Sequence, residues 1–269
     1  MGMLCIHERQ IKTYFGWLVA LAVCFANPAF ADSLRPRIAI IIDDLGYERA
    51  AGERAIDLPG PLAYAVLPGT PQANHLADAA HAAGKEVLLH LPLQAQEHVE
   101  PAEPGSLLLD MSRKQFAAAF AADLQSVPHI IGVNTHRGSL LTRHPGHMRW
   151  LMDEMVLQGN LFFIDSYTTA QSVALSIARE NSVPSVKRDV FLDPDRYPET
   201  VAREFARLKK IARRQGFAVG IGHPYPATLD YLELTLPELV SEGYDLVRIS
   251  DLIATEDPLR RGTMRFSGE

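Results

Sequence analysis

The chain has 269 residues, of which 32 are acidic and 26 basic, giving a formal net charge of −6, and 47% of its residues are hydrophobic. This length and apolar content suit one large α/β domain or two small ones. The acidic balance, without any run of lysine and arginine, argues against a nucleic-acid-binding protein.

The first 31 residues are typical of an export signal. Arg9 and Lys12 precede an apolar stretch from Tyr14 to Phe25, which leads to an Ala-x-Ala cleavage pattern at residues 29–31. The stretch is short for a membrane span of roughly 20 residues. We therefore expect cleavage after Ala31, a periplasmic location and no stable membrane span in the mature protein. The alternatives are an uncleaved membrane anchor and a lipoprotein attached at Cys24, although the valine before Cys24 is larger than the small residue usual there.

Both cysteines, Cys5 and Cys24, lie in the segment that we expect to be removed. The mature chain then has no disulfide and no thiol, so any metal must be held by His, Asp or Glu. Residues 32–36 are expected to form a short linker, residues 37–255 one domain, and residues 256–269 a flexible polar tail.

From Arg37 onward, short apolar runs alternate with amphipathic stretches. The apolar runs predict strands at Ile38–Ile42, Leu62–Leu67, Glu86–Leu91, Ile130–Asn134, Leu161–Ile164, Val190–Leu192, Phe217–Ile221 and Leu246–Ile249. The amphipathic stretches predict helices at Thr70–Ala83, Ser112–Ser126, Met148–Leu157, Thr169–Arg179, Pro198–Gln215 and Thr228–Glu242, the last broken at Pro237. Strands with continuous apolar runs are typical of a parallel sheet that is buried on both faces. About seven or eight β-then-α units favour a barrel over an open doubly wound sheet.

Local signals support the predicted helices. Ser112 and Gln115 have the spacing of a capping box at a helix start. Gly84, Gly159 and Gly216 each follow an amphipathic stretch, where a left-handed helix end favours glycine.

Polar residues stand at or just after the ends of most predicted strands. Because the carboxyl ends of parallel strands meet on one rim of a barrel, we expect these side chains to converge. Each one taken alone is more often structural, as a helix cap or a hydrogen-bonded strand end. Three histidines and an adjacent pair of carboxylates on one rim favour a functional site. The residues are Asp43, Asp44, His90, Asn134, His136, Ser139, Asp165, Ser166, Arg188, Asp189, Asp193 and His223.

The chemistry that these residues suit is metal-assisted hydrolysis. One carboxylate and two imidazoles can hold a divalent ion with open positions for water and substrate. Asp44, His90 and His136 fit the ligand roles. Such an ion lowers the pKa of a water molecule and polarises a carbonyl group.

The remaining charged residues fit proton transfer and its support. Asp43 fits the base that takes a proton from the water, and His223 fits the acid that protonates a leaving amine. Either Asp165 or Asp189 could orient His223, and Arg188 could hold Asp43 ionised.

The chain has no Gly-rich phosphate loop, no G-x-S-x-G elbow and no H-E-x-x-H motif. A phosphate- or nucleotide-using enzyme is therefore disfavoured. The polar residues left on the rim, Asn134, Ser139 and Ser166, are candidates for substrate binding.

Six ordered motifs resemble the divergent polysaccharide deacetylase family, exported bacterial proteins related to NodB-type carbohydrate esterases. The resemblance extends from about Arg37 to Leu252. It implies a single-domain distorted (β/α) barrel of about seven strands and a divalent metal, usually zinc. The motifs are Ile-Asp43-Asp44-Leu-Gly46, His90-Leu-Pro92, Gly132-x-Asn134-x-His136-x-Gly138-Ser139, Phe163-Ile-Asp165-Ser166, Arg188-Asp189-Val-Phe191-Leu-Asp193 and Gly222-His223-Pro224.

The resemblance also implies roles for individual residues. In the superfamily the first Asp of the pair is the base and the second binds the metal, which assigns these roles to Asp43 and Asp44. A motif after the third strand supplies two histidine ligands, but here only His90 matches, and Gln94 stands in place of the second. His136 would then supply the missing ligand.

The chain also departs from the family's motifs at and after the fourth predicted strand. The Arg-Pro-Tyr element of the superfamily has no match, and the loop Asn134–Ser139 takes its place. Arg137 stands where the family commonly has Met, and Thr135 where it has a second Asn.

Together these observations predict a metal-dependent deacetylase acting on N-acetyl or similar amide groups of an envelope polysaccharide or peptidoglycan-type glycan. The alternative, which Gln94 supports, is a catalytically silent barrel that binds envelope glycan or a protein partner.

Overall fold

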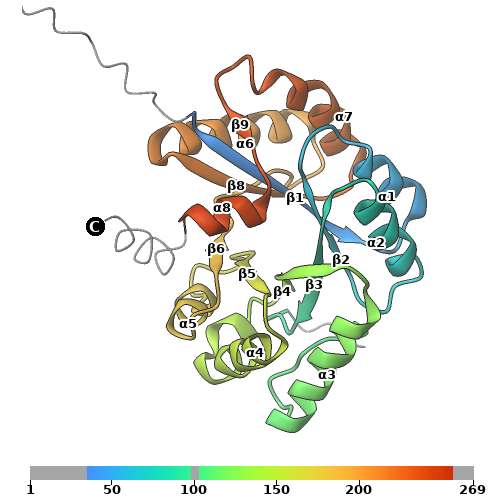
Figure 1. Cartoon of the computed structure of the whole chain (residues 1–269), viewed down its shortest axis with the longest axis vertical. Coiled ribbons are helices and arrows are strands. Elements are labelled where there is room, and N and C mark those ends of the chain that lie inside the picture. The colour runs from blue at the N-terminus through green and yellow to red at the C-terminus, as the bar shows by residue number, and fades with distance from the viewer. Residues whose placement is uncertain (1–34, 98–102, 257–269) are drawn as a thin grey trace, which may run out of the picture. The chain divides into compact units, whose positions relative to one another are not determined.

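The computed structural model describes residues 35–97 and 103–256 (Figure 1). The predicted leader, most of the predicted linker and nearly all of the predicted tail lie outside the described residues. Within the described part of the chain, no helix combines the length and the apolar character needed to cross a membrane.

The described residues form a curled, all-parallel sheet surrounded by helices, which confirms the predicted distorted (β/α) barrel (Figure 1). The sheet order is β6-β5-β4-β3-β2-β1-β8-β7, with β9 paired to β1. The strands are β1 (Arg37–Leu45), β2 (Ala63–Val66), β3 (Glu86–Leu93), β4 (Ile130–Arg137), β5 (Phe162–Asp165), β6 (Ser185–Lys187), β7 (Val190–Phe191), β8 (Phe217–Gly222) and β9 (Asp245–Leu246).

Consecutive residues join the two ends of this sheet. β6 pairs with β5 and β7 pairs with β8, although only Arg188 and Asp189 separate β6 from β7. The main-chain N–H of Arg188 donates to Asp165 (3.0 Å), and that of Asp189 donates to Val219 (2.9 Å). One short segment therefore bridges both edges, and the carboxyl ends of all the strands face one rim.

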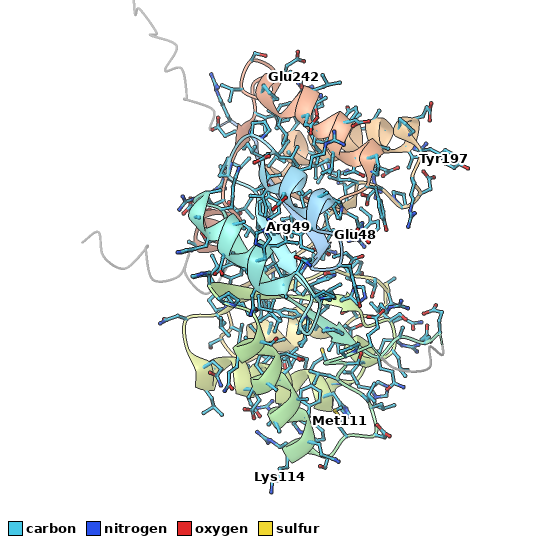
Figure 2. All side chains as sticks on the ribbon, turned by 90° about the vertical axis from the view of Figure 1, so that its right-hand side faces the viewer. Glu48, Arg49, Met111, Lys114, Tyr197 and Glu242 are labelled. Carbon is cyan, nitrogen blue, oxygen red and sulfur yellow. The ribbon has the colours of Figure 1, made fainter. Side chains whose placement is uncertain are left out.

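The helices begin and end where local chemistry favours it. Ser112 and Gln115 form the predicted capping box of α3. Gly216 ends α6 in the left-handed conformation, with φ +90°. Figure 2 shows the side chains, with Arg49 and Lys114 near the starts of two helices. The helices are α1 (Arg49–Ile56), α2 (Ala73–Ala82), α3 (Arg113–Ser126), α4 (Pro145–Gln158), α5 (Ala174–Glu180), α6 (Pro198–Gln215), α7 (Pro226–Thr235) and α8 (Ile249–Glu256), with the 3-10 turns η1 (Leu141–Arg143) and η2 (Leu236–Glu238).

The pleat of β1 divides its side chains between two buried clusters. Ile38, Ile40 and Ile42 lie in the large cluster between the sheet and the helices. Ala39 and Ile41 point the other way, into the interior of the barrel. Both faces of the strand are therefore apolar, which is why it appears in the sequence as a continuous run rather than an alternation.

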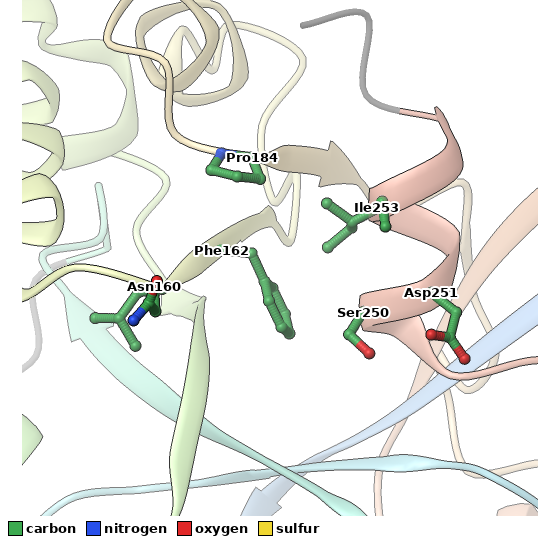
Figure 3. A pocket seen from close by; sticks show the side chains of 8 residues that line it. Asn160, Phe162, Pro184, Ser250, Asp251 and Ile253 are labelled. Atoms are coloured by element: carbon green, nitrogen blue, oxygen red, sulfur yellow. The ribbon is translucent and has the colours of Figure 1, made fainter. Parts of the chain in front are cut away.

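Helix α8 fills the barrel interior from the amino ends of the strands. Its residues Ile249, Leu252 and Ile253 are buried in the interior cluster. The N–H of Ile249 donates to the carboxylate of Glu86, the first residue of β3, at 2.9 Å. Beside α8 lies a pocket of about 490 Å³ that contains none of the predicted site residues (Figure 3). Its lining includes Phe162 and Ile253.

Three elements differ from the sequence predictions. Helix α1 was not predicted, because it is short and contains Gly52, a poor helix former. A Cβ at position 52 would lie 2.5 Å from Cδ1 of Leu76, so glycine lets α1 approach α2 closely. The strand predicted at Val190–Leu192 is instead the second of two short strands, and β6 was missed.

The strand predicted at Leu246–Ile249 ends early as β9. Ile249 begins α8 instead, since the buried carboxylate of Glu86 accepts its amide hydrogen. The predicted break at Pro237 is confirmed, because α7 ends at Thr235 and a 3-10 turn follows.

Candidate metal centre

The two adjacent carboxylates at the end of β1 lie on the same side of the strand. Neighbouring residues of a regular strand point to opposite faces. Asp44 breaks this rule with a left-handed φ of +59°, and the pairing of β1 with β2 shifts register between Ile42 and Leu45. As a result the carboxylates of Asp43 and Asp44 lie 3.6 and 3.1 Å from the same nitrogen, Nε2 of His90.

Three potential ligand atoms converge at this point of the rim. Nε2 of His90 and Nδ1 of His136 lie 3.0 Å apart, and each is within 3.1 Å of Oδ1 of Asp44. His136 stands two residues after Asn134 in β4, so both side chains project from the same face of that strand. The structure thus brings together Asp44, His90 and His136, the three residues predicted as metal ligands.

The geometry of this cluster fits a divalent cation. Adjacent ligands of an ion bound at about 2.0–2.2 Å are separated by roughly 3 Å. Oδ1 of Asp44 is buried and faces only the two imidazole nitrogens among the described residues, so a bound cation would satisfy all three atoms at once. Burial opposes ionisation of Asp44, but the imidazoles of His136 and His90 outweigh it and hold its pKa well below the usual range.

Asn134 connects the base candidate to one of the ligand candidates. Its side chain is fully buried, and its Nδ2 donates to Oδ1 of Asp43 at 2.7 Å. Its Oδ1 therefore accepts, and Nδ1 of His90 donates to it at 2.8 Å. The neutral form of His90 that can bind a metal therefore keeps its proton on Nδ1 and directs the Nε2 lone pair toward Asp44 and His136.

The charges around the ligand cluster also favour a cation there. Burial alone would lower the pKa of His90, but Asp43 and Asp44 raise it to about 9. The two carboxylates thus attract positive charge to the place where the ligand atoms meet. A metal ion that binds there displaces this proton.

His223 lies across the rim from the ligand cluster. Its Nε2 is 3.7 Å from Oδ2 of Asp44. Its ring stacks on Tyr225, with ring centres 5.2 Å apart. Nδ1 donates to Oδ1 of Asp193 at 2.9 Å, and the backbone N–H of His223 donates to Oδ2 at 2.7 Å. Burial disfavours protonation of His223, but Asp193 reverses this and raises its pKa.

The prediction that Asp165 or Asp189 orients His223 is therefore wrong, because Asp193 takes that position. Asp165 accepts hydrogen bonds from the N–H of Tyr167 (2.9 Å) and from Ser172 (2.7 Å) at the end of its own strand. Asp189 accepts from the N–H of Val219 at 2.9 Å, in the middle of β8 and four residues before His223. Both carboxylates hold turns and strand ends in place.

Arg188 also differs from its predicted contact. Its guanidinium donates to the carbonyl oxygens of Ser166 (2.6 Å) and Tyr167 (2.9 Å) instead of pairing directly with Asp43. Burial lowers the pKa of Arg188, and Asp43 acts on it only through space. Asn134 is the direct hydrogen-bond partner of Asp43.

The predicted substrate-binding residues have different surroundings. Asn134 lies inside the site, as described above. The hydroxyl of Ser166 is buried and has no hydrogen-bond partner among the described residues. Ser139 lies near the surface, where its hydroxyl accepts from the N–H of Gln96 at 2.9 Å. Gln94 points away from the cluster, and its Oε1 accepts from the N–H of Leu109 at 2.7 Å.

Sequence reasoning missed two contributors to the site. Asp193 was part of a noted motif but was given no role, and Glu103 was not considered because it lies in a long loop without a motif. The carboxylate of Glu103 lies 2.9 Å from Nε2 of His136.

A parallel barrel with carboxylates and imidazoles at its carboxyl rim is the architecture of NodB-like carbohydrate esterases. A model of the divergent polysaccharide deacetylase family matches residues 40–253, and the chain belongs to that family. This confirms the resemblance drawn from the sequence motifs.

Individual relatives agree with this assignment. The chain is 34% identical over 234 residues to the uncharacterized protein YibQ of Escherichia coli (strain K12), covering 87% of this chain and 71% of that one. The crystal structure of the uncharacterized protein ATU2773 from Agrobacterium tumefaciens C58 superimposes with a TM-score of 0.77 at 24% identity, covering 81% of this chain and 89% of the other. The peptidoglycan deacetylase PdaC from Bacillus subtilis gives a TM-score of 0.51 at 14% identity, covering 88% and 100%. Both structural likenesses show the fold.

Proposed function

We propose that this protein is a metal-dependent deacetylase that hydrolyses N-acetyl or similar amide groups of a cell-envelope glycan. The observation that carries the proposal is the convergence of Asp44, His90 and His136, in which a buried carboxylate oxygen and two imidazole nitrogens face one another. Membership of the family and the similarity to a peptidoglycan deacetylase support a peptidoglycan-type substrate.

Asp44, His90 and His136 would hold the ion, with zinc as the proposed metal because the donor set of two imidazoles and one carboxylate suits it. A divalent ion bound there supplies Lewis-acid polarisation of the amide carbonyl and lowers the pKa of a water molecule. The reaction adds water across the amide bond and yields a carboxylate and an amine.

Asp43 would accept the proton from the attacking water. Its carboxylate is buried next to the ligand cluster, and burial raises its pKa, which makes it a stronger base than an exposed carboxylate. The hydrogen bond from Asn134 holds one carboxylate oxygen, leaving Oδ2 to face His90 and the centre of the site.

His223 would protonate the leaving amine. Asp193 accepts its Nδ1 proton and raises its pKa, which favours the imidazolium form that can donate from Nε2. Because Asp193 also accepts from the backbone N–H of His223 and from Thr228, the carboxylate is fixed in its own position. The imidazole therefore keeps its orientation across the rim from Asp43.

Delivery to the envelope is part of the proposal. The charged and apolar segment that ends at Ala31 would direct export to the periplasm and be cleaved there. The N-terminal sequence of the protein recovered from a periplasmic extract tests this, and a chain that still begins at Met1 would contradict it.

The experiment that tests the function compares zinc content and acetate release from N-acetylated envelope glycans for the wild type, Asp43→Asn and the exposed control Asp110→Asn. We expect stoichiometric zinc in all three proteins. Acetate release should fall about 10²- to 10⁴-fold only in Asp43→Asn. Equal release from the wild type and Asp43→Asn would show that Asp43 is not the base.

A catalytically silent barrel that binds glycan or a protein partner is the second candidate. The observation that favours it is Gln94, whose amide binds the backbone of Leu109 and offers no ligand to the site. Persistent absence of metal after addition of zinc, together with glycan binding without acetate release, would establish this alternative.

A further inference from the structure

The loop that connects β3 to α3 is anchored to the carboxyl end of the sheet. The N–H of Leu107 donates to Pro92 at 2.9 Å, and the N–H of Gln94 donates to Leu107 at 3.0 Å. The side chain of Gln94 holds Leu109 as well. This part of the loop therefore has a defined position relative to β3, the strand that carries His90.

Glu103 extends from this loop to the ligand cluster. Its Oε2 lies 2.9 Å from Nε2 of His136, and its Oε1 lies 3.0 Å from Nη2 of Arg137. The side chain of Glu103 is about three-quarters buried. Its main-chain carbonyl oxygen accepts from the N–H of Ser106 at 3.1 Å, which closes a turn. The third residue of this turn is Gly105, whose φ of +78° favours glycine.

We propose that Glu103 is a positioning residue that fixes the ring orientation and the tautomer of His136 in the metal site. This inference rests on the proposed metal-dependent function and extends it to a residue outside the ligand set. A carboxylate is only an acceptor, so Nε2 of His136 must carry the proton that is shared with Glu103. The Nδ1 lone pair of neutral His136 is then free for a cation, next to Asp44 and His90.

The two imidazoles of the cluster are held by analogous contacts with opposite nitrogens. The amide of Asn134 accepts from Nδ1 of His90, which frees Nε2, whereas Glu103 accepts from Nε2 of His136, which frees Nδ1. In both cases the nitrogen without an outer partner is the one that faces Asp44. If Glu103 contacted His136 only by chance, it could bond to either ring nitrogen. It bonds to the nitrogen that leaves the other one facing Asp44.

A simple surface ion pair with Arg137 is the competing explanation for the position of Glu103. The guanidinium binds the other carboxylate oxygen, and its side chain is 42% exposed, so the pair contributes little by itself. Replacing Arg137 by methionine removes this pair and leaves the contact with His136. The two explanations therefore predict different effects of the two substitutions.

The test measures zinc affinity by titration calorimetry for the wild type, Glu103→Ala, Glu103→Gln, Arg137→Met and Glu97→Gln. Glu97 lies in the same loop and contacts the hydroxyl of Ser139, so it is a matched control for charge and location. We expect Glu103→Ala to weaken zinc binding about 10- to 100-fold, as for other outer partners of metal-binding histidines. Glu103→Gln, which keeps an acceptor oxygen, should lose less, and the two controls should stay within about twofold of the wild type.

A second measurement reads the positioning directly and does not need zinc. In the metal-free wild type, nitrogen-15 NMR should show a proton on Nε2 of His136 that exchanges slowly with solvent. This signal should be lost in Glu103→Ala and retained in Arg137→Met.

The outcomes separate this inference from the proposed function. If the wild type binds zinc and Glu103→Ala binds it equally well with the Nε2 proton unchanged, the role of Glu103 is refuted while the metal site stands. If the wild type binds no zinc, the proposed function fails, and the NMR signal still decides whether Glu103 positions His136.

Discussion

A buried carboxylate beneath the β3–α3 loop provides a quantitative test of the structure that is independent of the metal site. Asp123 lies on the inner face of α3, and its Oδ2 has no hydrogen-bond partner among the described residues. It packs against the backbone of Gly105, where an added Cβ would lie 2.4 Å from Oδ1. Burial raises the pKa of Asp123 to about 7.

This shift destabilises the folded protein at neutral and alkaline pH. The unfolded chain releases the proton near the ordinary pKa of 3.8, whereas the folded chain keeps it until about pH 7. Between these values the folded state binds more protons, so the stability falls as the pH rises, and above pH 7 the full penalty of roughly 4 kcal/mol is present. The uncharged variant Asp123→Asn does not titrate and avoids this penalty.

Urea unfolding of the wild type and Asp123→Asn at several pH values between 5 and 8 measures the effect. Any cost in stability that the asparagine side chain itself brings does not depend on pH. This cost therefore does not affect how the difference in unfolding free energy between the two proteins changes with pH. We expect the stability of Asp123→Asn relative to the wild type to increase by roughly 2–3 kcal/mol from pH 5 to pH 8. A difference that stays constant over this range would show that Asp123 is solvated or paired, and would refute the reasoning.

Two further predictions concern the acid side of the site and the packing of α1. Asp193→Asn removes the carboxylate that accepts the Nδ1 proton of His223. We expect acetate release to fall about 100-fold or more, with zinc affinity unchanged. If the variant were as active as the wild type, the orientation of His223 would not depend on Asp193. Tyr64→Phe removes the buried hydrogen bond of 2.6 Å from the Tyr64 hydroxyl to the carbonyl oxygen of Ala55. We expect the free energy of unfolding, measured with urea, to fall by about 1 kcal/mol. An unchanged midpoint would mean that this bond adds nothing to stability.

Sequence patterns predict most of this fold because the strands are buried on both faces. Such strands appear as continuous apolar runs, and β1, β3 and β8 were placed within a few residues on this basis. Helices α1 and α8 could not be predicted, because contacts between distant residues decide them. Gly52 is required by Leu76 of α2, and the start of α8 is set by the carboxylate of Glu86, which lies 163 positions earlier.

The site also has one part that the sequence predicts and one part that it does not. The predicted part follows from where the strands end, and the other part depends on the register between strands. Parallel strands place their carboxyl ends together, so the grouping of Asp44, His90 and His136 follows from the fold class. The choice of Asp193 over Asp189 depends on the pairing of β7 with β8, which sets Phe191 opposite Ile221. This register carries Asp193 to His223 and Asp189 back to Val219, and no local pattern in the sequence encodes it.

The pairing of β1 has a consequence for how the chain folds. One edge of this strand pairs with β2, about twenty residues later, and near its start with β9, about 210 residues later, whereas the other edge pairs along its length with β8, about 180 residues later. A nascent chain that has not yet reached Phe217 therefore exposes an apolar strand edge that other chains can join. Folding of the barrel cannot be completed until β8 and β9 have been synthesised, because the contacts that complete its central strand are among the most distant in sequence.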